Sequence, residues 1–287
     1  MKYYHVDVFS SKPLSGNGLT VILPTKPLSD QALLDITREF RQFESIFLYP
    51  LNDEGYSARI FTVDEELDFA GHPILGAGAV VHKLHYGHKK EADIYLLPGD
   101  RRIHIHSRNA GQFFQVTMNQ GEARFLGTVS KSDYGRIAEA LNLQKKDIAP
   151  DYPVEVVSTG LPYLLVPVSK NLDKCCITNR GFEEFLSEFG AKFVYVFDPG
   201  TLTCRTWDNF GNTEDVATGS AAGPLCAYLV KNGKNKLNEV ITLHQGEYVG
   251  RPSIIKGWTE KKGDLSETYI TGEVSFFASG TIDSEGG

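Results

Sequence analysis

Two stretches of the sequence are alike and decide the fold that we expect: Asp68-Phe69-Ala70-Gly71-His72-Pro73 and Asp215-Val216-Ala217-Thr218-Gly219-Ser220. Each has a carboxylate, then an apolar residue and an alanine, then a glycine next to a polar residue, with spacings that differ by one position. Each leads into an apolar segment rich in Ala and Gly, 73–81 and 218–231, that is typical of a buried helix. A similarity at so long an interval indicates duplication of a domain, with a site between the halves. Because the identity is weak, chance similarity is the alternative.

The segments around these two helices alternate between predicted strands and helices. Ser29 is a favourable N-cap for a helix that has Leu33, Ile36 and Phe40 on one face. Turn residues at 98–100 and 109–111 predict two hairpins. Further helices are predicted at 132–141 and 182–189, and strands at 19–23, 45–49, 56–61, 154–157, 163–168, 193–197 and 202–207. The last residues, 279–287, are expected to be frayed.

The composition argues against several classes of protein. The chain has 287 residues and a formal net charge of -7, without the clustered Lys and Arg that a nucleic-acid-binding surface needs. No segment approaches the roughly 18 apolar residues of a membrane span. The first residues alternate like a strand and not like a secretory signal, so a cytoplasmic location is expected. The four cysteines show no CxxC spacing, which argues against a disulfide framework or a zinc site.

The starts of the two predicted buried helices offer a site for an anion. A helix N-terminus presents backbone N–H groups and the positive end of the helix dipole. Gly71 and Gly219 allow a ligand to approach the backbone closely. The neighbouring His72, Asp215 and Ser220 can form hydrogen bonds or exchange protons. We therefore expect both helix starts to face one cleft and to hold a carboxylate there.

Glu44 is the candidate acid/base residue. It lies between Phe43 and Ile46-Phe47, and a carboxyl group in apolar surroundings has its pKa raised toward neutrality, which suits acid/base catalysis. A structural reading competes with each candidate. A glutamate at a helix-to-strand junction is ordinarily a surface residue, a histidine at a helix start is more often structural, and Asp68 and Asp215 could be plain N-caps.

The other histidines do not indicate a metal site. His104 and His106 alternate on one strand face but have no carboxylate or cysteine at a useful spacing, so a solvated face is the simpler reading. His82, His85 and His88 fit the C-terminal end of the first buried helix, where a cation complements the helix dipole. The glycines of that helix match neither a G-x-G-x-x-G fingerprint nor a P-loop, so nucleotide binding is not indicated.

Four segments, in this order and over nearly the whole chain, resemble a known family. They read His5-Val6-Asp7-Val8-Phe9 through Gly16-Asn17, Phe43-Glu44-Ser45-Ile46-Phe47, Arg59-Ile60-Phe61-Thr62 through Pro73, and Glu214-Asp215-Val216-Ala217-Thr218-Gly219-Ser220-Ala221. Weaker support comes from 158–162, Gln245-Gly246 and 250–252. With these motifs the chain resembles the PhzF family of phenazine-biosynthesis isomerases, within the diaminopimelate epimerase-like superfamily.

The resemblance implies a fold of the α+β class. It consists of two similar domains related by a pseudo-twofold duplication, each a curved, mostly antiparallel sheet wrapped around a central helix. The expected domains are residues 1–123 and 124–267, and a C-terminal strand near 268–280 is expected to return to the first domain. Relatives are commonly homodimers, so the resemblance implies the same here.

The resemblance also implies a site and a type of substrate. Enzymes of the family use neither a metal nor an organic cofactor, and they act on a small molecule that carries a carboxylate. The positions that match the family are Glu44, His72 and Asp215 for catalysis, and Asn17, Gly71, Gly219 and Ser220 for substrate binding.

Several positions depart from the family pattern. Gly18 and Val216 stand where a proline is usual, and Phe43 stands where a serine is usual, so the identity of the substrate does not follow from the resemblance. Ala70 and Thr218 stand where the epimerase branch has two cysteines. A racemase mechanism that uses two thiols is therefore not available to this chain.

Three functions follow from these residues. The first is a cofactor-independent isomerase, in which Glu44 removes a proton from an activated carbon and returns it elsewhere, while His72 and Asp215 orient the substrate and relay protons. The second is a one-base racemase or epimerase of an amino or hydroxy acid, which would exchange the α-proton without moving a double bond. The third is a non-catalytic ligand-binding or scaffold protein on the same fold, although a scaffold has no need for all three residues.

Overall fold

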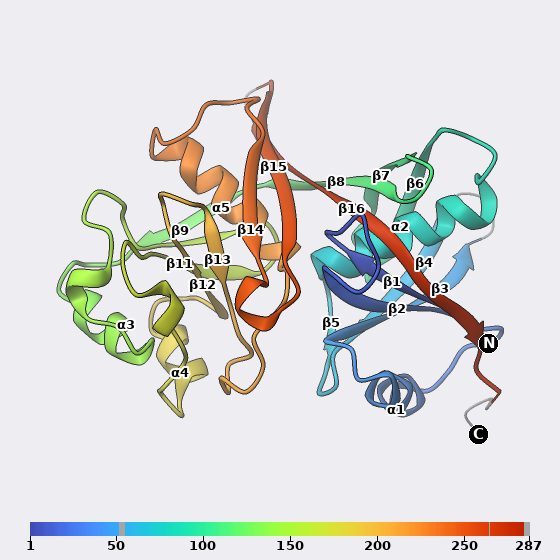
Figure 1. Ribbon diagram of the computed structural model, residues 1–287, viewed down its shortest axis with the longest axis horizontal. Coiled ribbons are helices and arrows are strands. Elements are labelled where there is room, and N and C mark those ends of the chain that lie inside the picture. Colours follow the sequence, from blue (N-terminus) through green and yellow to red (C-terminus); the bar gives the residue numbers. More distant parts are fainter. Residues whose placement is uncertain (52–54, 264, 284–287) are drawn as a thin grey trace. The chain divides into compact units, whose positions relative to one another are not determined.

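A ring of strands in the first unit of the chain, which includes the C-terminal strand, closes around one helix. The computed structural model describes residues 1–51, 55–263 and 265–283. Contacts divide the chain into a first unit, Met1–Asn119 with Ile270–Gly287, and a second unit, Gln120–Tyr269. Figure 1 labels the elements of both units, and strands β8 and β16 each contribute residues to both.

The ring of the first unit follows the order β1-β2-β3-β4-β6-β7-β8-β16, and β16 also pairs with β1, which closes it. The strands are β1 (Lys2–Val8), β2 (Asn17–Leu23), β3 (Glu44–Leu51), β4 (Gly55–Phe61), β6 (Glu91–Pro98), β7 (Ile103–Asn109), β8 (Phe114–Glu122) and β16 (Leu265–Thr281). The short β5 (Glu66–Leu67) pairs with β4. The pairs β2–β3 and β4–β6 are parallel, so the sheet is mixed.

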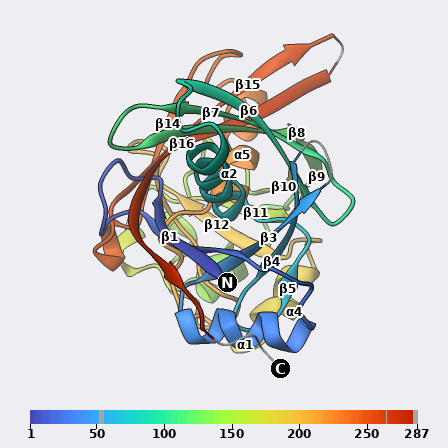
Figure 2. The same cartoon turned by 90° about the vertical axis from the view of Figure 1, so that its right-hand side faces the viewer.

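Helix α2 (Gly71–His85) occupies the centre of this ring, and its residues from Gly71 to His82 are all buried. Figure 2 looks nearly along the helix and shows strands of the first unit around it. Small residues permit the close packing, because a Cβ on Gly76 would lie only 2.4 Å from Leu19 Cδ2. Helix α1 (Asp30–Phe40) contacts β3 and β4 and buries Leu33 in a separate apolar cluster that contains Phe47.

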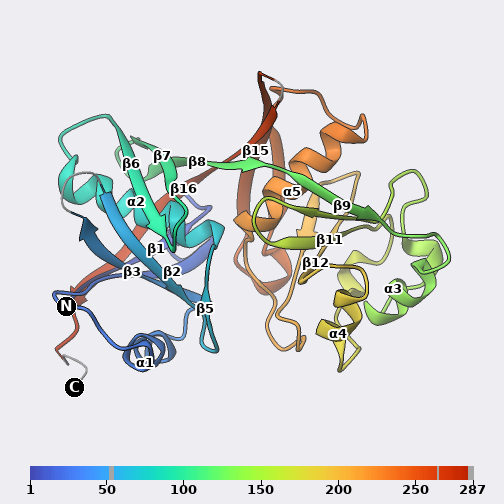
Figure 3. The same cartoon turned by 180° about the vertical axis from the view of Figure 1, so that it is seen from behind.

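The second unit also surrounds one buried helix, α5 (Gly219–Lys231), which contacts β10, β11 and β15. Its strands follow the order β15-β14-β13-β12-β11-β10-β9. They are β9 (Arg124–Thr128), β10 (Glu155–Ser158), β11 (Pro162–Pro167), β12 (Phe193–Phe197), β13 (Thr203–Arg205), β14 (Ile241–Gln245) and β15 (Ser253–Lys262). Helices α3 (Tyr134–Ala140) and α4 (Phe182–Ser187) lie on the side of these strands away from α5 (Figure 3), over a second apolar cluster. Short 3-10 helices lie at Lys145–Asp147, Leu172–Lys174 and Glu247–Val249.

Most predicted elements are confirmed, including the helix capped by Ser29, whose side chain accepts a hydrogen bond from Ala32 N at 3.3 Å. The first buried helix begins at Gly71 and not near Pro73. The expectation of fraying at 279–287 is wrong for its first part, because Ser279, Gly280 and Thr281 belong to β16 and pair with β1. Residues 284–287 lie outside the described residues.

The pairing of β16 with β1 has a local reason. A Cβ on Gly280 would lie 2.8 Å from the ring of Tyr3, so glycine gives that ring room on the neighbouring strand. None of the helices in the described ranges combines the length and the apolar character needed to cross a bilayer. The expected domain duplication stays a prediction.

Candidate functional site

The first unit brings together Asn17, Glu44 and His72 from three elements. Asn17 begins β2, Glu44 begins β3 beside it, and His72 is the second residue of α2. All three side chains are buried; Glu44 is 6% exposed and His72 is 3% exposed. Glu44 Oε2 lies 3.2 Å from His72 Nδ1, and Asn17 Nδ2 lies 3.4 Å from the same nitrogen. The surface reading of Glu44 is therefore wrong, because the first residues of β3 occupy buried positions of the sheet.

Burial lowers the pKa of His72 from 6.5 to about 3, so its imidazole is neutral at ordinary pH. The buried Nε2 has no hydrogen-bond partner within the described part of the chain. A neutral imidazole has one N–H and one lone pair. An ionised Glu44 would accept the proton from Nδ1 and leave Nε2 as an acceptor, whereas a protonated Glu44 would leave Nε2 as a donor. The pair can therefore pass one proton between Glu44 and Nε2.

The start of α2 is not capped by the residue that the sequence suggested. The N-cap is Ala70, which makes no side-chain capping bond, while Asp68 lies two residues earlier and is exposed. The N-cap reading of Asp68 is wrong because the helix begins at Gly71. A backbone end without a side-chain cap is suited to an anionic ligand.

The second unit places Asp215, Gly219 and Ser220 around the start of α5. The Asp215 side chain is buried, and its Oδ2 accepts a hydrogen bond from Thr218 Oγ1 at 2.5 Å. Ser220 Oγ lies 2.7 Å from Tyr163 OH. The carbonyl of Gly219, the first helical residue, accepts a hydrogen bond from Gln120 Nε2 at 2.9 Å. The N-cap of α5 is Thr218, so the N-cap reading of Asp215 is also wrong.

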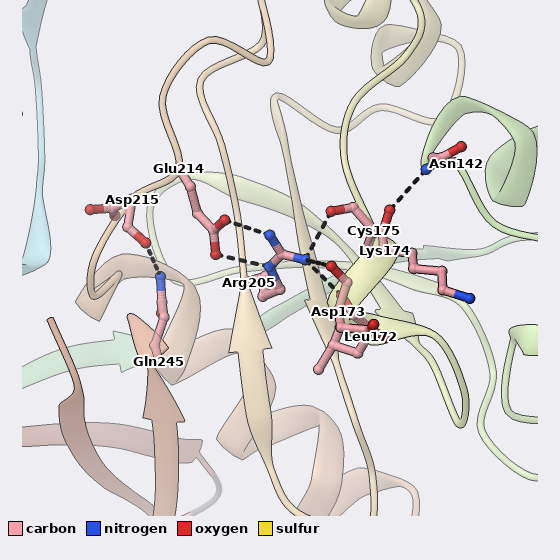
Figure 4. Close-up of polar contacts among 9 residues, drawn as sticks. All are labelled: Asn142, Leu172, Asp173, Lys174, Cys175, Arg205, Glu214, Asp215 and Gln245. Atoms are coloured by element: carbon pink, nitrogen blue, oxygen red, sulfur yellow. Dashed lines mark hydrogen bonds and ion pairs between the residues drawn. The ribbon is translucent and has the colours of Figure 1, made fainter. Parts of the chain in front are cut away.

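Gln245, at the end of β14, is a residue of this region that the site prediction missed. Its Nε2 donates to the backbone carbonyl of Asp215 and to Thr218 Oγ1, both at 2.9 Å. Its Oε1 accepts from Tyr195 OH at 3.0 Å and from Thr218 N at 3.1 Å. Figure 4 shows Gln245 reaching toward Asp215. The available signal was the Gln245-Gly246 motif, in which an amide side chain ends a strand just before a glycine.

A buried ion pair holds the residue before Asp215. Arg205 Nε and Nη2 donate to the two carboxylate oxygens of Glu214 at 2.9 and 2.6 Å. Arg205 Nη1 donates to the carbonyls of Leu172 and Cys175 at 2.7 and 2.9 Å (Figure 4). Both charged side chains are buried. This arrangement fixes the backbone just before Asp215, whereas Gln245 holds the carbonyl of Asp215 itself.

The contacts of His104, His106 and His82 differ from those that the sequence suggested. A carboxylate does accompany His104 and His106, because Asp93 on the neighbouring β6 places Oδ1 2.9 and 3.2 Å from their ring nitrogens. The register of β6 with β7 creates this contact, which sequence spacing could not reveal. His82 is buried and bonded to Ser107 Oγ at 2.8 Å. No cluster of three or more His, Cys, Asp or Glu placed to hold a metal ion occurs in the described ranges.

The chain matches known proteins over nearly its full length. A family model described as phenazine biosynthesis-like protein matches residues 6–280. The trans-2,3-dihydro-3-hydroxyanthranilate isomerase of Pseudomonas chlororaphis is 30% identical, with 98% of each chain covered. The structure of a predicted epimerase from Pseudomonas aeruginosa is similar, with a TM-score of 0.93, 43% identity and 99% of each chain covered.

A more distant structure shows the breadth of the fold. A hydroxyproline epimerase from Agrobacterium vitis aligns with a TM-score of 0.65 at 12% identity, over 98% of this chain and 90% of that one, and so shows the fold alone. The fold is that of the diaminopimelate epimerase-like proteins, and the resemblance found in the sequence motifs is confirmed. The chain belongs to the family of phenazine biosynthesis-like proteins and is an isomerase.

Proposed function

We propose that the protein is a cofactor-independent isomerase that moves a proton within a small carboxylate-bearing substrate, with Glu44 as the acid/base residue. The observation that carries the proposal is the buried Glu44 carboxyl group 3.2 Å from a neutral His72. A positioned acid/base group of this kind typically contributes about 10²–10⁴ in rate.

The reaction conserves protons and electrons. Glu44 removes a proton from an activated C–H bond of the substrate, and the electrons of that bond move the double bond. The proton returns at another carbon from Glu44, which ends ionised as it began. If His72 delivers the proton instead, Nε2 gives up the proton that it carries while Nδ1 takes one from Glu44; the number of bound protons is then restored, and the imidazole must return to its first tautomer before the next turnover.

We assign the substrate carboxylate to the helix starts. The N-cap residues Ala70 and Thr218 make no side-chain capping bond, which supports the backbone N–H groups of Gly71 and Gly219 as its donors. Ser220 adds a hydroxyl group. Asn17 orients His72, and Asp215 accepts a hydrogen bond from a substrate amine or hydroxyl.

A one-base racemase is the second candidate, because a relative with 43% identity is a predicted epimerase. The experiment that separates the two is a proton NMR screen in D₂O over cyclic and linear amino, hydroxy and dienoic acids. It includes trans-2,3-dihydro-3-hydroxyanthranilate, which the name of the P. chlororaphis relative suggests.

The outcomes of this screen are distinct. An isomerase introduces deuterium at a new carbon and moves a double bond. A racemase exchanges the α-proton, inverts the centre and leaves unsaturation in place. Binding of a compound without exchange or turnover by the wild-type protein would contradict both enzyme proposals and favour the scaffold reading.

A further inference from the structure

The side-chain amide of Gln245 can take only one orientation. Gln245 is fully buried. The backbone N–H of Thr218 is an obligatory donor and faces one end of the amide at 3.1 Å. The backbone carbonyl of Asp215 is an obligatory acceptor and faces the other end at 2.9 Å. A flipped amide would set N–H against N–H and oxygen against oxygen, so Oε1 faces Thr218 N and Nε2 faces Asp215 O.

This orientation determines where the hydroxyl proton of Thr218 points. The second proton of Gln245 Nε2 is directed at Thr218 Oγ1, 2.9 Å away, so Oγ1 acts as the acceptor in that contact. A hydroxyl group has a single proton to donate. The remaining contact of Oγ1 is with Asp215 Oδ2, and there Thr218 is the donor. The chain of hydrogen bonds runs in one direction, from Gln245 through Thr218 to Asp215.

The backbone around Gln245 keeps this geometry in place. Gly246 has a φ of +83°. A Cβ there would lie 2.7 Å from the carbonyl oxygen of Val216 and 2.3 Å from that of Arg251. Glycine therefore lets the end of β14 approach the loop before α5 closely, and Gln245 spans the remaining gap to Thr218.

We propose that Gln245 is a positioning residue for Asp215. Through Thr218 it holds Oδ2 of Asp215 as a hydrogen-bond acceptor and so fixes the orientation of the carboxylate that acts on substrate. The proposal rests on the proposed function only in that it takes Asp215 to act on substrate. It goes beyond that function by naming the residue that sets the direction of the hydrogen bond to Asp215.

The test compares Thr218→Val, Thr218→Ser and Gln245→Glu with the wild-type enzyme. Thr218→Val keeps the shape and removes the donor, so kcat is expected to fall about 10- to 100-fold with KM changed less, as for loss of a hydrogen bond to a charged group. Thr218→Ser keeps the hydroxyl and is expected to recover most of the loss. Gln245→Glu replaces the donor by an acceptor, which draws the Thr218 proton away from Asp215, and is expected to behave like Thr218→Val.

A matched control is Thr259→Val on β15, which removes a buried hydroxyl without a hydrogen-bond partner in the described ranges and is expected to leave kcat unchanged. Thermal unfolding of each variant checks that the fold is kept. The proposal is overturned if Thr218→Val keeps the wild-type kcat, or if Thr218→Ser is as impaired as Thr218→Val.

Neutron diffraction of the wild-type protein after exchange into D₂O tests the same inference without any activity assay. A deuteron on Thr218 Oγ1 that points at Asp215 Oδ2 supports the proposal, and one that points at Gln245 overturns it. Because this result does not depend on turnover, a failure of the positioning proposal is distinguishable from a failure of the isomerase proposal.

Discussion

The starts of the two buried helices differ in how their polar side chains are bonded. At the start of α2, the Nδ1 of His72 is near Glu44, and its Nε2 has no partner in the described part of the chain. At the start of α5, the side chains of Thr218 and Gln245 are engaged in a directed set of hydrogen bonds. A side chain that moves a proton needs a lone pair that can accept it. A side chain that orients a substrate needs a position that its own hydrogen bonds hold constant. We infer that α2 supplies the proton transfer and α5 the orientation.

The largest expected effect tests the α2 side of this comparison. Glu44→Gln keeps the size of the side chain and removes its ability to carry a proton, so kcat is expected to fall by about 10²–10⁴. Stability is expected to change little, because the substitution keeps the size of the side chain and creates no cavity. Steady-state kinetics on the substrate found in the D₂O screen, together with urea unfolding, measure both quantities. A variant that keeps most of its kcat would exclude Glu44 as the acid/base residue.

The next effect tests the region before α5. Here the substitution is expected to lower stability, whereas Glu44→Gln is expected to lower kcat and leave stability nearly unchanged. Arg205→Met leaves the buried Glu214 carboxylate without its bidentate partner, and breaking such a pair costs about 3–5 kcal/mol of stability. The free energy of unfolding from urea titration measures the loss. As a control, Arg205→Met with Glu214→Leu removes both charges and is expected to recover part of it. If Arg205→Met proved as stable as the wild type, the ion pair would not be what fixes the backbone before Asp215.

A smaller effect is the pH dependence of the free energy of unfolding that arises from His72 at the start of α2. Its pKa is about 3 in the folded chain and 6.5 as the ordinary value. Between these values the unfolded chain binds a proton that the folded chain does not, so the free energy of unfolding falls as pH falls. The slope from this group is up to about 1.4 kcal/mol per pH unit.

Urea unfolding between pH 6.5 and pH 4 measures this slope. His72→Gln is expected to flatten it, whereas His88→Gln removes an exposed histidine after the same helix and serves as the control. An unchanged slope in His72→Gln would mean that the imidazole is not held neutral by burial, and the proton relay through Nε2 would lose its basis.

The features that could be predicted from the sequence are those that a short local pattern determines. Ser29 and the apolar face that follows it predicted α1, and the turn at 98–100 predicted the hairpin of β6 and β7. The motif residues around Glu44 and His72 predicted the family, because they occur together with the 214–221 segment in the family order.

Contacts between distant segments could not be predicted in this way. The family resemblance implied that a C-terminal strand returns to the first domain, but no local pattern gives the register of β16 with β1. The contact of Asp93 with His104 likewise depends on strand register. The role of Gln245 depends on partners from β12, the loop before α5 and the helix start itself. A sequence pattern gives the type of such a residue, whereas its bonding follows only from the folded arrangement.

The smallest expected effects come from glycines and compare how each buried helix packs. Gly76→Ala in α2 would place a Cβ 2.4 Å from Leu19 Cδ2, with Val6 and Val8 also near, so overpacking of an aliphatic core is expected to cost about 1–3 kcal/mol. Gly223→Ala in α5 would place a Cβ 1.8 Å from Gln120 Oε1.

The two clashes should differ in kind. In α2 the neighbours are apolar, so Gly76→Ala is expected to lower stability and leave KM near its wild-type value. In α5 the displaced group is the amide that donates to the Gly219 carbonyl and accepts from Thr159 Oγ1, so Gly223→Ala is expected to disturb the helix start and raise KM as well. Gly135→Ala in α3, where a Cβ would meet open space, is the control and is expected to add up to about 1 kcal/mol through helix propensity. Equal KM values in Gly76→Ala and Gly223→Ala would remove the distinction drawn between the two helix starts, since the α5 network would then have no part in substrate binding.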